Sequence, residues 1–133
     1  MPVDNLVDLR SQFGPRGMRR FLREAALING KWVFAERRIE VRNPASGALI
    51  GTVPDLGLND MEHAIGTAAQ ALPAWKGLLP RERADRLLAW ADAILEGKRE
   101  LAALMTAEQG KPLADAQSEV EYGASFVRWF AEL

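Results

Sequence analysis

The final segment of the chain, from residue 113 onward, has the spacing of one long helix that is apolar on two faces. One stripe consists of Leu113, Ala116, Val120, Ala124 and Val127, and the other of Tyr122, Phe126, Trp129 and Leu133. A helix with two apolar faces is buried on two sides. The remaining residues are too few to cover both faces, so we expect further polypeptide or a partner to pack there.

The segment 27–54 has the pattern of a small antiparallel β unit. Asn29-Gly30 stands between apolar residues and predicts a tight hairpin, because both turn positions need a positive φ. Residues 39–42 alternate with period two, as in a half-buried strand. The turn residues 43–47 then precede a second such strand, which stops at Pro54.

Residues 59–133 read as three to four helices. Asn59 is the predicted cap of the first, with Glu62 completing a capping box, and we expect a disturbance near Pro73. Pro80 suits the first turn of the next helix, which Gly97 ends. Its predicted inner face consists of Ala84, Leu87, Leu88, Ala91, Ile94 and Leu95. A short helix up to Gly110 and the long helix from residue 113 complete the series.

Residues 1–26 form the predicted N-terminal helical extension, a weak helix interrupted by Gly14-Pro15 and Gly17. Four arginines lie within residues 16–23. A charge run of this kind is typical of a solvated helix, and a targeting or surface-binding role is the alternative.

Composition excludes several classes of function. With 133 residues, 48% hydrophobic and 26% charged, the chain fits one small globular domain. The net charge of −1 gives no electrostatic basis for binding nucleic acid or an anionic membrane. The sequence has no cysteine, which excludes disulfides, thiolate metal sites and a cysteine nucleophile. A small domain without disulfides favours the cytoplasm.

No motif of a catalytic or phosphate-binding site is complete in this chain. His63 is the only histidine and is expected to be solvated. Gly110-Lys111 shares two residues with a phosphate-binding loop, but a helix-capping glycine followed by a solvated lysine is the favoured interpretation. Glu119 and Glu121 point apart on a helix and form no acid–base pair.

Several blocks of the chain together resemble the start of the aldehyde dehydrogenase family. They are residues 27–32, 43–47, 50–54, 71–75, 81–83, 104–113 and 124–132. The block at 104–113, Leu-Met-Thr-Ala-Glu-Gln-Gly-Lys-Pro-Leu, is the most specific. The resemblance covers about four fifths of the chain and is closest to bacterial succinate-semialdehyde dehydrogenases. It implies an α/β fold, of which residues 27–133 are part of the cofactor-binding domain without its Rossmann-like sheet.

The family oxidises an aldehyde to a carboxylic acid with NAD or NADP as the hydride acceptor. The resemblance implies a cysteine nucleophile, a glutamate that activates water, and homo-oligomers. In the family these catalytic residues and the dinucleotide-binding segments lie beyond the part that this chain matches. We therefore assign no catalytic or cofactor-binding residue, and we expect this chain alone to be inactive and to bind no cofactor.

Two minor sites follow from the resemblance. Many members hold a monovalent cation, which here implicates Val41, Arg42 and Glu108; the alternative is a helix C-terminal acid without an ion. The last helix lines the substrate entrance in relatives, which implicates Tyr122 and Phe126; the alternative is plain core packing.

Three functional hypotheses remain. The chain is the N-terminal part of a succinate-semialdehyde-type dehydrogenase, or an interaction module that docks onto an intact or split aldehyde dehydrogenase. As an interaction module, the chain would associate with itself or dock onto the remainder of the enzyme. An enzyme with unrelated chemistry is the third, and no group of residues supports it.

Overall fold

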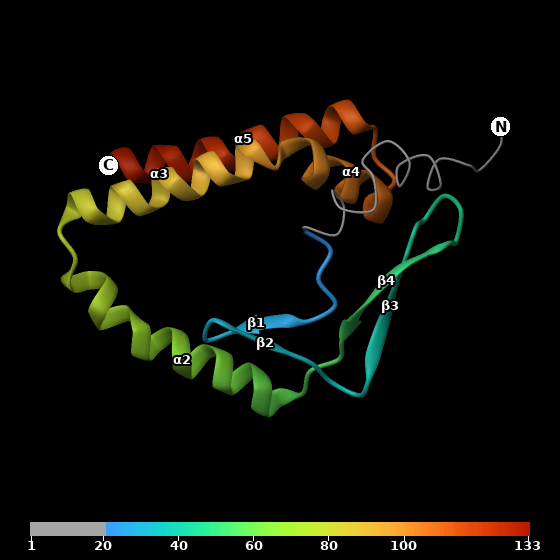
Figure 1. Cartoon of the computed structure of the whole chain (residues 1–133), viewed down its shortest axis with the longest axis horizontal. Helices are drawn as coiled ribbons and strands as arrows, with labels where there is room; N and C mark the ends of the chain where they lie inside the picture. The colour runs from blue at the N-terminus through green and yellow to red at the C-terminus, as the bar shows by residue number, and fades with distance from the viewer. Residues whose placement is uncertain (1–20) are drawn as a thin grey trace.

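The computed structural model describes residues 21–133, which form two small antiparallel sheets and four helices (Figure 1). Their order is β1 (Ala26–Ile28), β2 (Lys31–Val33), β3 (Arg38–Arg42), β4 (Leu49–Pro54), α2 (Leu58–Gly77), α3 (Pro80–Glu96), α4 (Lys98–Gln109) and α5 (Leu113–Glu132). Residues 1–20 of the predicted extension lie outside the described residues, and with them its break at 14–17 and three of the four arginines of the run at 16–23. Among residues 21–133, none of the helices combines the length and the hydrophobicity that a membrane span requires.

The predicted Asn-Gly hairpin is confirmed as the turn between β1 and β2. Asn29 and Gly30 have φ values of 51° and 71°, the left-handed conformation that a two-residue hairpin turn requires. The two strands pair antiparallel, with Leu27 opposite Trp32. Ile28 is buried and is the inward-facing residue of this hairpin.

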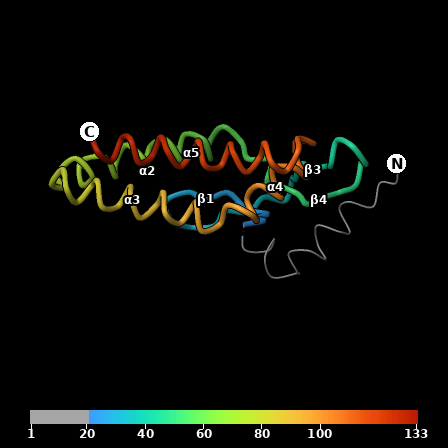
Figure 2. The backbone as a smooth tube through the Cα atoms, turned by 90° about the horizontal axis from the view of Figure 1, so that it is seen from above, coloured from blue at the N-terminus to red at the C-terminus, as the bar shows by residue number. Residues whose placement is uncertain are grey.

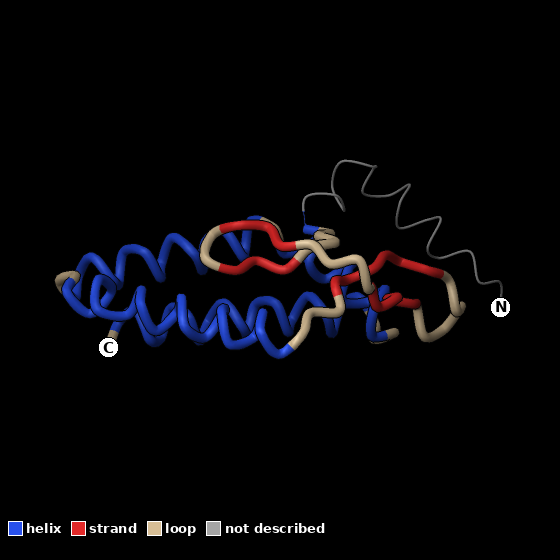
Figure 3. The backbone as a smooth tube through the Cα atoms, turned by 90° about the horizontal axis from the view of Figure 1, so that it is seen from below, coloured by secondary structure: helices blue, strands red, loops and turns tan. Residues whose placement is uncertain are grey.

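The predicted β unit consists of two separate hairpins rather than one continuous sheet (Figure 3). In the turn between β3 and β4, the side-chain oxygen of Asn43 accepts hydrogen bonds from the backbone N–H groups of Ala45 (2.8 Å) and Ser46 (3.1 Å). Gly47 completes the turn with a φ of 70°. A shift in register follows Val41, and it leaves Ile50, a buried residue of β4, without a direct partner on β3.

The predicted cap of the first long helix is wrong by two positions. Helix α2 starts at Leu58, its cap is Gly57, and the Asp60 carboxylate accepts a hydrogen bond from the Gly57 N–H at 3.2 Å. Asp60 occupies the third helical position, where a short carboxylate reaches back to the cap, so Asn59 and Glu62 are not needed. The helix also continues through Pro73 to Gly77, so the expected disturbance does not end it. Proline removes one helical hydrogen bond and crowds the preceding turn, and here only one further turn follows it.

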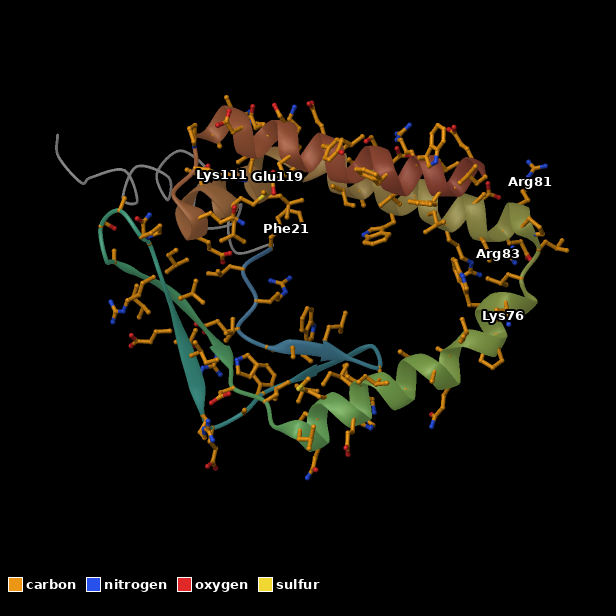
Figure 4. All side chains as sticks on the ribbon, turned by 180° about the vertical axis from the view of Figure 1, so that it is seen from behind. Phe21, Lys76, Arg81, Arg83, Lys111 and Glu119 are labelled. Carbon is orange, nitrogen blue, oxygen red and sulfur yellow. The ribbon has the colours of Figure 1, made fainter. Side chains whose placement is uncertain are left out.

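The basic residues Lys76, Arg81 and Arg83 flank the turn between α2 and α3 (Figure 4). Pro80 stands at the first helical position of α3, as predicted. Arg83 donates a hydrogen bond to the backbone oxygen of Leu78 at 2.6 Å, and the Glu82 carboxylate accepts one from the Leu79 N–H at 2.8 Å. The charged side chains of Arg83 and Glu82 therefore stabilise the turn through these hydrogen bonds.

Helices α3, α4 and α5 form a helical layer, in which α3 and α5 run antiparallel and side by side (Figures 1 and 2). Its core consists of Ala102, Ala116 and Val120, with Ile94, Leu101, Met105 and Leu113 packed against it. The predicted inner face of α3 and the first stripe of α5 are buried or half-buried, which confirms both. Gly97 and Gly110 end α3 and α4 as predicted, and Gly110 has a φ of 75°.

The second stripe of α5 is open to solvent in this chain. Tyr122, Phe126, Trp129 and Leu133 are 64%, 47%, 63% and 84% exposed. Among the described residues, no large side chain is fully buried, and α2 contains no buried residue at all. The described part of the chain therefore covers only one of the two faces that the sequence predicts to be buried.

Candidate functional site

A pocket of about 120 Å³ lies where the segment before β1, the β3–β4 hairpin and α4 meet. It is lined by Phe21, Leu22, Arg23, Val41, Ile50, Gly51, Thr52, Val53, Leu104 and Glu108. The lining comes from three parts of the sequence that are far apart in the chain. We refer to it as the hairpin pocket.

The hairpin pocket brings together two of the three residues predicted to bind a monovalent cation. Val41 of β3 and Glu108 near the end of α4 both line it, whereas Arg42 does not. The Arg42 guanidinium donates hydrogen bonds to the Glu40 carboxylate (2.6 and 2.9 Å) and to the backbone oxygen of Gly47 (2.9 Å). Its side chain therefore stabilises the hairpin turn, and only its backbone oxygen is available for the predicted role.

No group of three acidic, histidine or cysteine side chains that could hold a metal is found among residues 21–133. A cation at the hairpin pocket would therefore depend on backbone oxygens together with Glu108. Hard monovalent and divalent cations accept oxygen ligands of this kind. The residues fit such an ion chemically, and its binding stays a prediction.

Glu24 is a residue of this region that the sequence patterns did not reveal. Its carboxylate accepts hydrogen bonds from the backbone N–H and the hydroxyl of Thr52, at 2.8 and 3.0 Å. Arg38 donates to the Glu24 backbone oxygen at 2.8 Å and to the Thr52 hydroxyl at 2.7 Å. The hydrogen bonds from Thr52, with a smaller contribution from the Arg38 charge, lower the pKa of Glu24. No motif signals this arrangement, because its partners are 28 and 14 positions apart in the chain.

Tyr122 and Phe126, the residues predicted at the substrate entrance, form one aromatic pair on the open face of α5. Their ring centroids are 4.7 Å apart and the planes meet at 82°, an edge-to-face contact. The alternative for both residues is plain core packing. Within the described chain neither ring is buried, so neither belongs to the core formed here. Their role at an entrance stays a prediction.

A second, larger groove runs between α3, α4 and α5, with a volume of about 390 Å³. Its lining is almost entirely apolar: Trp90, Ile94, Leu101, Leu104, Met105, Glu108, Val120, Gly123, Ala124 and Val127. Leu104 and Glu108 also line the hairpin pocket, so α4 separates the two hollows. No sequence pattern predicted this groove, although Gly123 leaves a gap in the side-chain surface of α5.

The charged residues near the end of α4 have structural partners. Lys111, predicted to be solvated, pairs with the Glu119 carboxylate of α5 (Figure 4). Glu121 pairs instead with Lys98 at the start of α4. The two glutamates therefore diverge as predicted: Glu119 joins α5 to the loop after α4, and Glu121 joins it to the start of α4. His63 is exposed on α2.

Comparison with known proteins places these features in a family. The model of the aldehyde dehydrogenase family matches residues 32–133. The glutarate-semialdehyde dehydrogenase of Pseudomonas putida is 49% identical over 112 residues, which cover 83% of this chain and 23% of that protein. The NADP(+) succinate-semialdehyde dehydrogenase of Escherichia coli is also 49% identical, with the same coverage.

Solved structures agree with the sequence comparison. A crystal structure of an NADP-dependent enzyme from E. coli matches with a TM-score of 0.83 and 47% identity, over 86% of this chain and 24% of that one. Other matching structures of the family contain NADP or NAD+. The chain thus spans about a quarter of the length of its relatives and matches their N-terminal part, a finding that does not favour an independent docking module. This chain belongs to the aldehyde dehydrogenase family, and its similarity is to the semialdehyde dehydrogenases within it.

Proposed function

We propose that this chain supplies part of an NAD(P)-dependent dehydrogenase that oxidises an aldehyde carrying a carboxylate at its other end. The observation that carries the proposal is the 49% identity to two enzymes named for such substrates, the glutarate and succinate semialdehydes. Residues 27–133 would then belong to the cofactor-binding domain of the whole enzyme.

The contribution of this chain to such a reaction is structural. It contains no cysteine and therefore cannot supply the thiolate that attacks the aldehyde in the family. Both sheets of the described residues are antiparallel, whereas a dinucleotide sits at the ends of parallel strands that lead into helices. These residues do not fit NAD(P) by themselves, and we assign none of them to the cofactor.

Helix α5 has the properties expected of an interface between this chain and the rest of the enzyme. Its outer face carries Tyr122, Phe126, Trp129 and Phe130, each at least 47% exposed. Large aromatic side chains gain free energy when they are buried, and an open apolar row of this kind commonly marks an interface. We propose that the rest of the enzyme covers this face and that the pair Tyr122–Phe126 borders the path of the aldehyde.

The hairpin pocket is the proposed site of a monovalent cation. This proposal is supported by the position of Val41 and Glu108, which line the same small cavity although they are 67 positions apart in the sequence. An ion at this point would connect β3 to α4. Its role would be to stabilise this region, away from the reacting atoms.

A chimeric enzyme tests the proposal directly. Residues 27–133 would replace the matching quarter of the P. putida glutarate-semialdehyde dehydrogenase, and reduction of NAD+ or NADP+ would be followed with both semialdehydes. We expect turnover of at least one of them, because the chain has the fold of the segment that it replaces. A matched chimera with Phe126→Asp, which places a charge on the open face of α5, is expected to lose it.

A folded, tetramerising or dimerising chimera that turns over neither semialdehyde contradicts the proposed substrate class. If it instead oxidises aldehydes without an acid group, the family assignment stands and the carboxylate preference is wrong.

A further inference from the structure

Residues 21–25 cross from the helical layer to the β3–β4 hairpin, and we refer to them as the strap. At one end the strap carries Phe21, whose ring lies against Gly97, the buried corner between α3 and α4. A methyl group at Gly97 would overlap this ring. The absence of a side chain at Gly97 is therefore what allows Phe21 to sit beside the helical layer, where Figure 4 shows it.

The other end of the strap is bound to β4 and β3. Glu24 accepts the two hydrogen bonds from Thr52, and Arg38 donates to the Glu24 backbone oxygen. Gly51 lies under this attachment: a methyl group there would stand 3.4 Å from the Glu24 carboxylate and 3.8 Å from the Leu22 side chain. Only the approach at Gly97 requires a glycine, since an added methyl group at Gly51 would make an ordinary van der Waals contact with the strap. The strap is therefore held by shape at its helical end and by hydrogen bonds at its hairpin end.

Within residues 21–133, the β3–β4 hairpin has no extensive packing against any helix. Its extensive packing is between its own two strands. At its tip, Pro44 approaches Gly110, where an added methyl group would stand 3.1 Å from the proline ring. The hairpin also faces α4 across the hairpin pocket, and three strap residues line that pocket.

We propose that the strap positions the β3–β4 hairpin on the helical layer and thereby holds Val41 opposite Glu108. Phe21 and Glu24 are the two positioning residues, one fixed by shape and the other by hydrogen bonds. The identity of an ion between Val41 and Glu108 rests on the proposed function, whereas the position of the hairpin does not.

The sequence offers a direct way to measure this position, because it contains no cysteine. Spin labels at Ala45→Cys, in the hairpin turn, and Ala114→Cys, at the start of α5, would report the hairpin-to-helix distance by double electron–electron resonance. Both sites are exposed, and neither belongs to the strap. The full chain would be measured with Phe21→Ala and Glu24→Gln combined, and with Gly97→Ala as a second way to displace the ring.

The expected result is a narrow distance distribution for the parent chain and a broader, longer one for both strap variants. The matched control combines Phe34→Ala and Glu36→Gln, exposed residues between β2 and β3, and is expected to keep the narrow distribution. Far-ultraviolet circular dichroism on the same samples verifies that the helices remain, so that a loss of position is separated from unfolding.

Strap variants that keep both their helices and the narrow distribution overturn the proposal. So does a control variant that broadens the distribution as much as the strap variants do. Repeating the measurement in choline chloride, without alkali ions, tests whether the strap or a bound ion sets the position of the hairpin. If the distance distribution of the parent chain broadens in choline chloride, the ion and not the strap sets the position of the hairpin. An inactive chimera would leave the distances unaffected.

Discussion

The Glu24 carboxylate is bound twice by one residue, since both the backbone N–H and the hydroxyl of Thr52 donate to the same oxygen. These bonds favour the ionised carboxylate and lower its pKa from the ordinary value of 4.5. A carboxyl group whose pKa is lower in the folded chain contributes stability above its unfolded pKa. That contribution is lost as the pH falls through the folded value.

We therefore predict that the attachment between Glu24 and Thr52 weakens only at a pH below 4.5. The amide proton of Thr52, followed by NMR during an acid titration, should shift with a midpoint below that value. In a Glu24→Gln variant this titration should disappear. A midpoint above 4.5, or an unchanged titration in the variant, would contradict the assignment.

The two faces of α5 should respond differently to truncation. Val120 is 7% exposed and belongs to the core, so Val120→Ala is expected to lower the free energy of unfolding by roughly 2 kcal/mol. Phe126 is larger but 47% exposed, and Phe126→Ala should cost less than about 1 kcal/mol, chiefly the contact with Tyr122. Urea unfolding followed by circular dichroism compares them. An equal or greater loss for Phe126→Ala would mean that the outer face is already covered.

Local sequence signals predicted most of the individual elements. Asn29-Gly30, Pro80 and Gly110 mark their turns and helix ends because each has a backbone requirement that can be read without knowing the fold. The cap of α2 does not follow from the sequence, because Gly57 carries no capping side chain and Asn59 two positions later is a residue type that favours a cap.

The arrangement of the site could not be predicted in the same way. Val41 and Glu108 were associated only through the family resemblance, and their shared pocket depends on how a hairpin docks onto a helix. Glu24 was not predicted at all, since its three hydrogen bonds come from two residues of the second hairpin, Thr52 and Arg38. The sequence predicted that both apolar faces of α5 would be buried. Periodicity alone does not decide which of the two stripes packs inside this chain.

Two glycines in the helical layer should respond in opposite directions to alanine. Gly110 has a φ of 75° and lies against Pro44, so Gly110→Ala is expected to destabilise the chain by about 1–2 kcal/mol. Gly123 lies inside α5 with open space where a methyl group would be, so Gly123→Ala should stabilise it by about 1 kcal/mol. Thermal unfolding of the two variants beside the parent measures both. Destabilisation by Gly123→Ala would contradict the open space at this position.

The aromatic pair on α5 gives the prediction closest to catalysis. If Phe126 borders the path of the aldehyde, Phe126→Ala in the chimeric dehydrogenase should raise KM for the semialdehyde roughly tenfold, since it removes apolar contact with the substrate. The turnover number should change less, because no reacting atom touches this ring. Phe130→Ala, on the same helix and 63% exposed, is the matched control for loss of an aromatic side chain. Steady-state kinetics at saturating cofactor separates KM from kcat. Equal effects of the two substitutions on KM would assign Phe126 to packing against the rest of the enzyme and not to the substrate path.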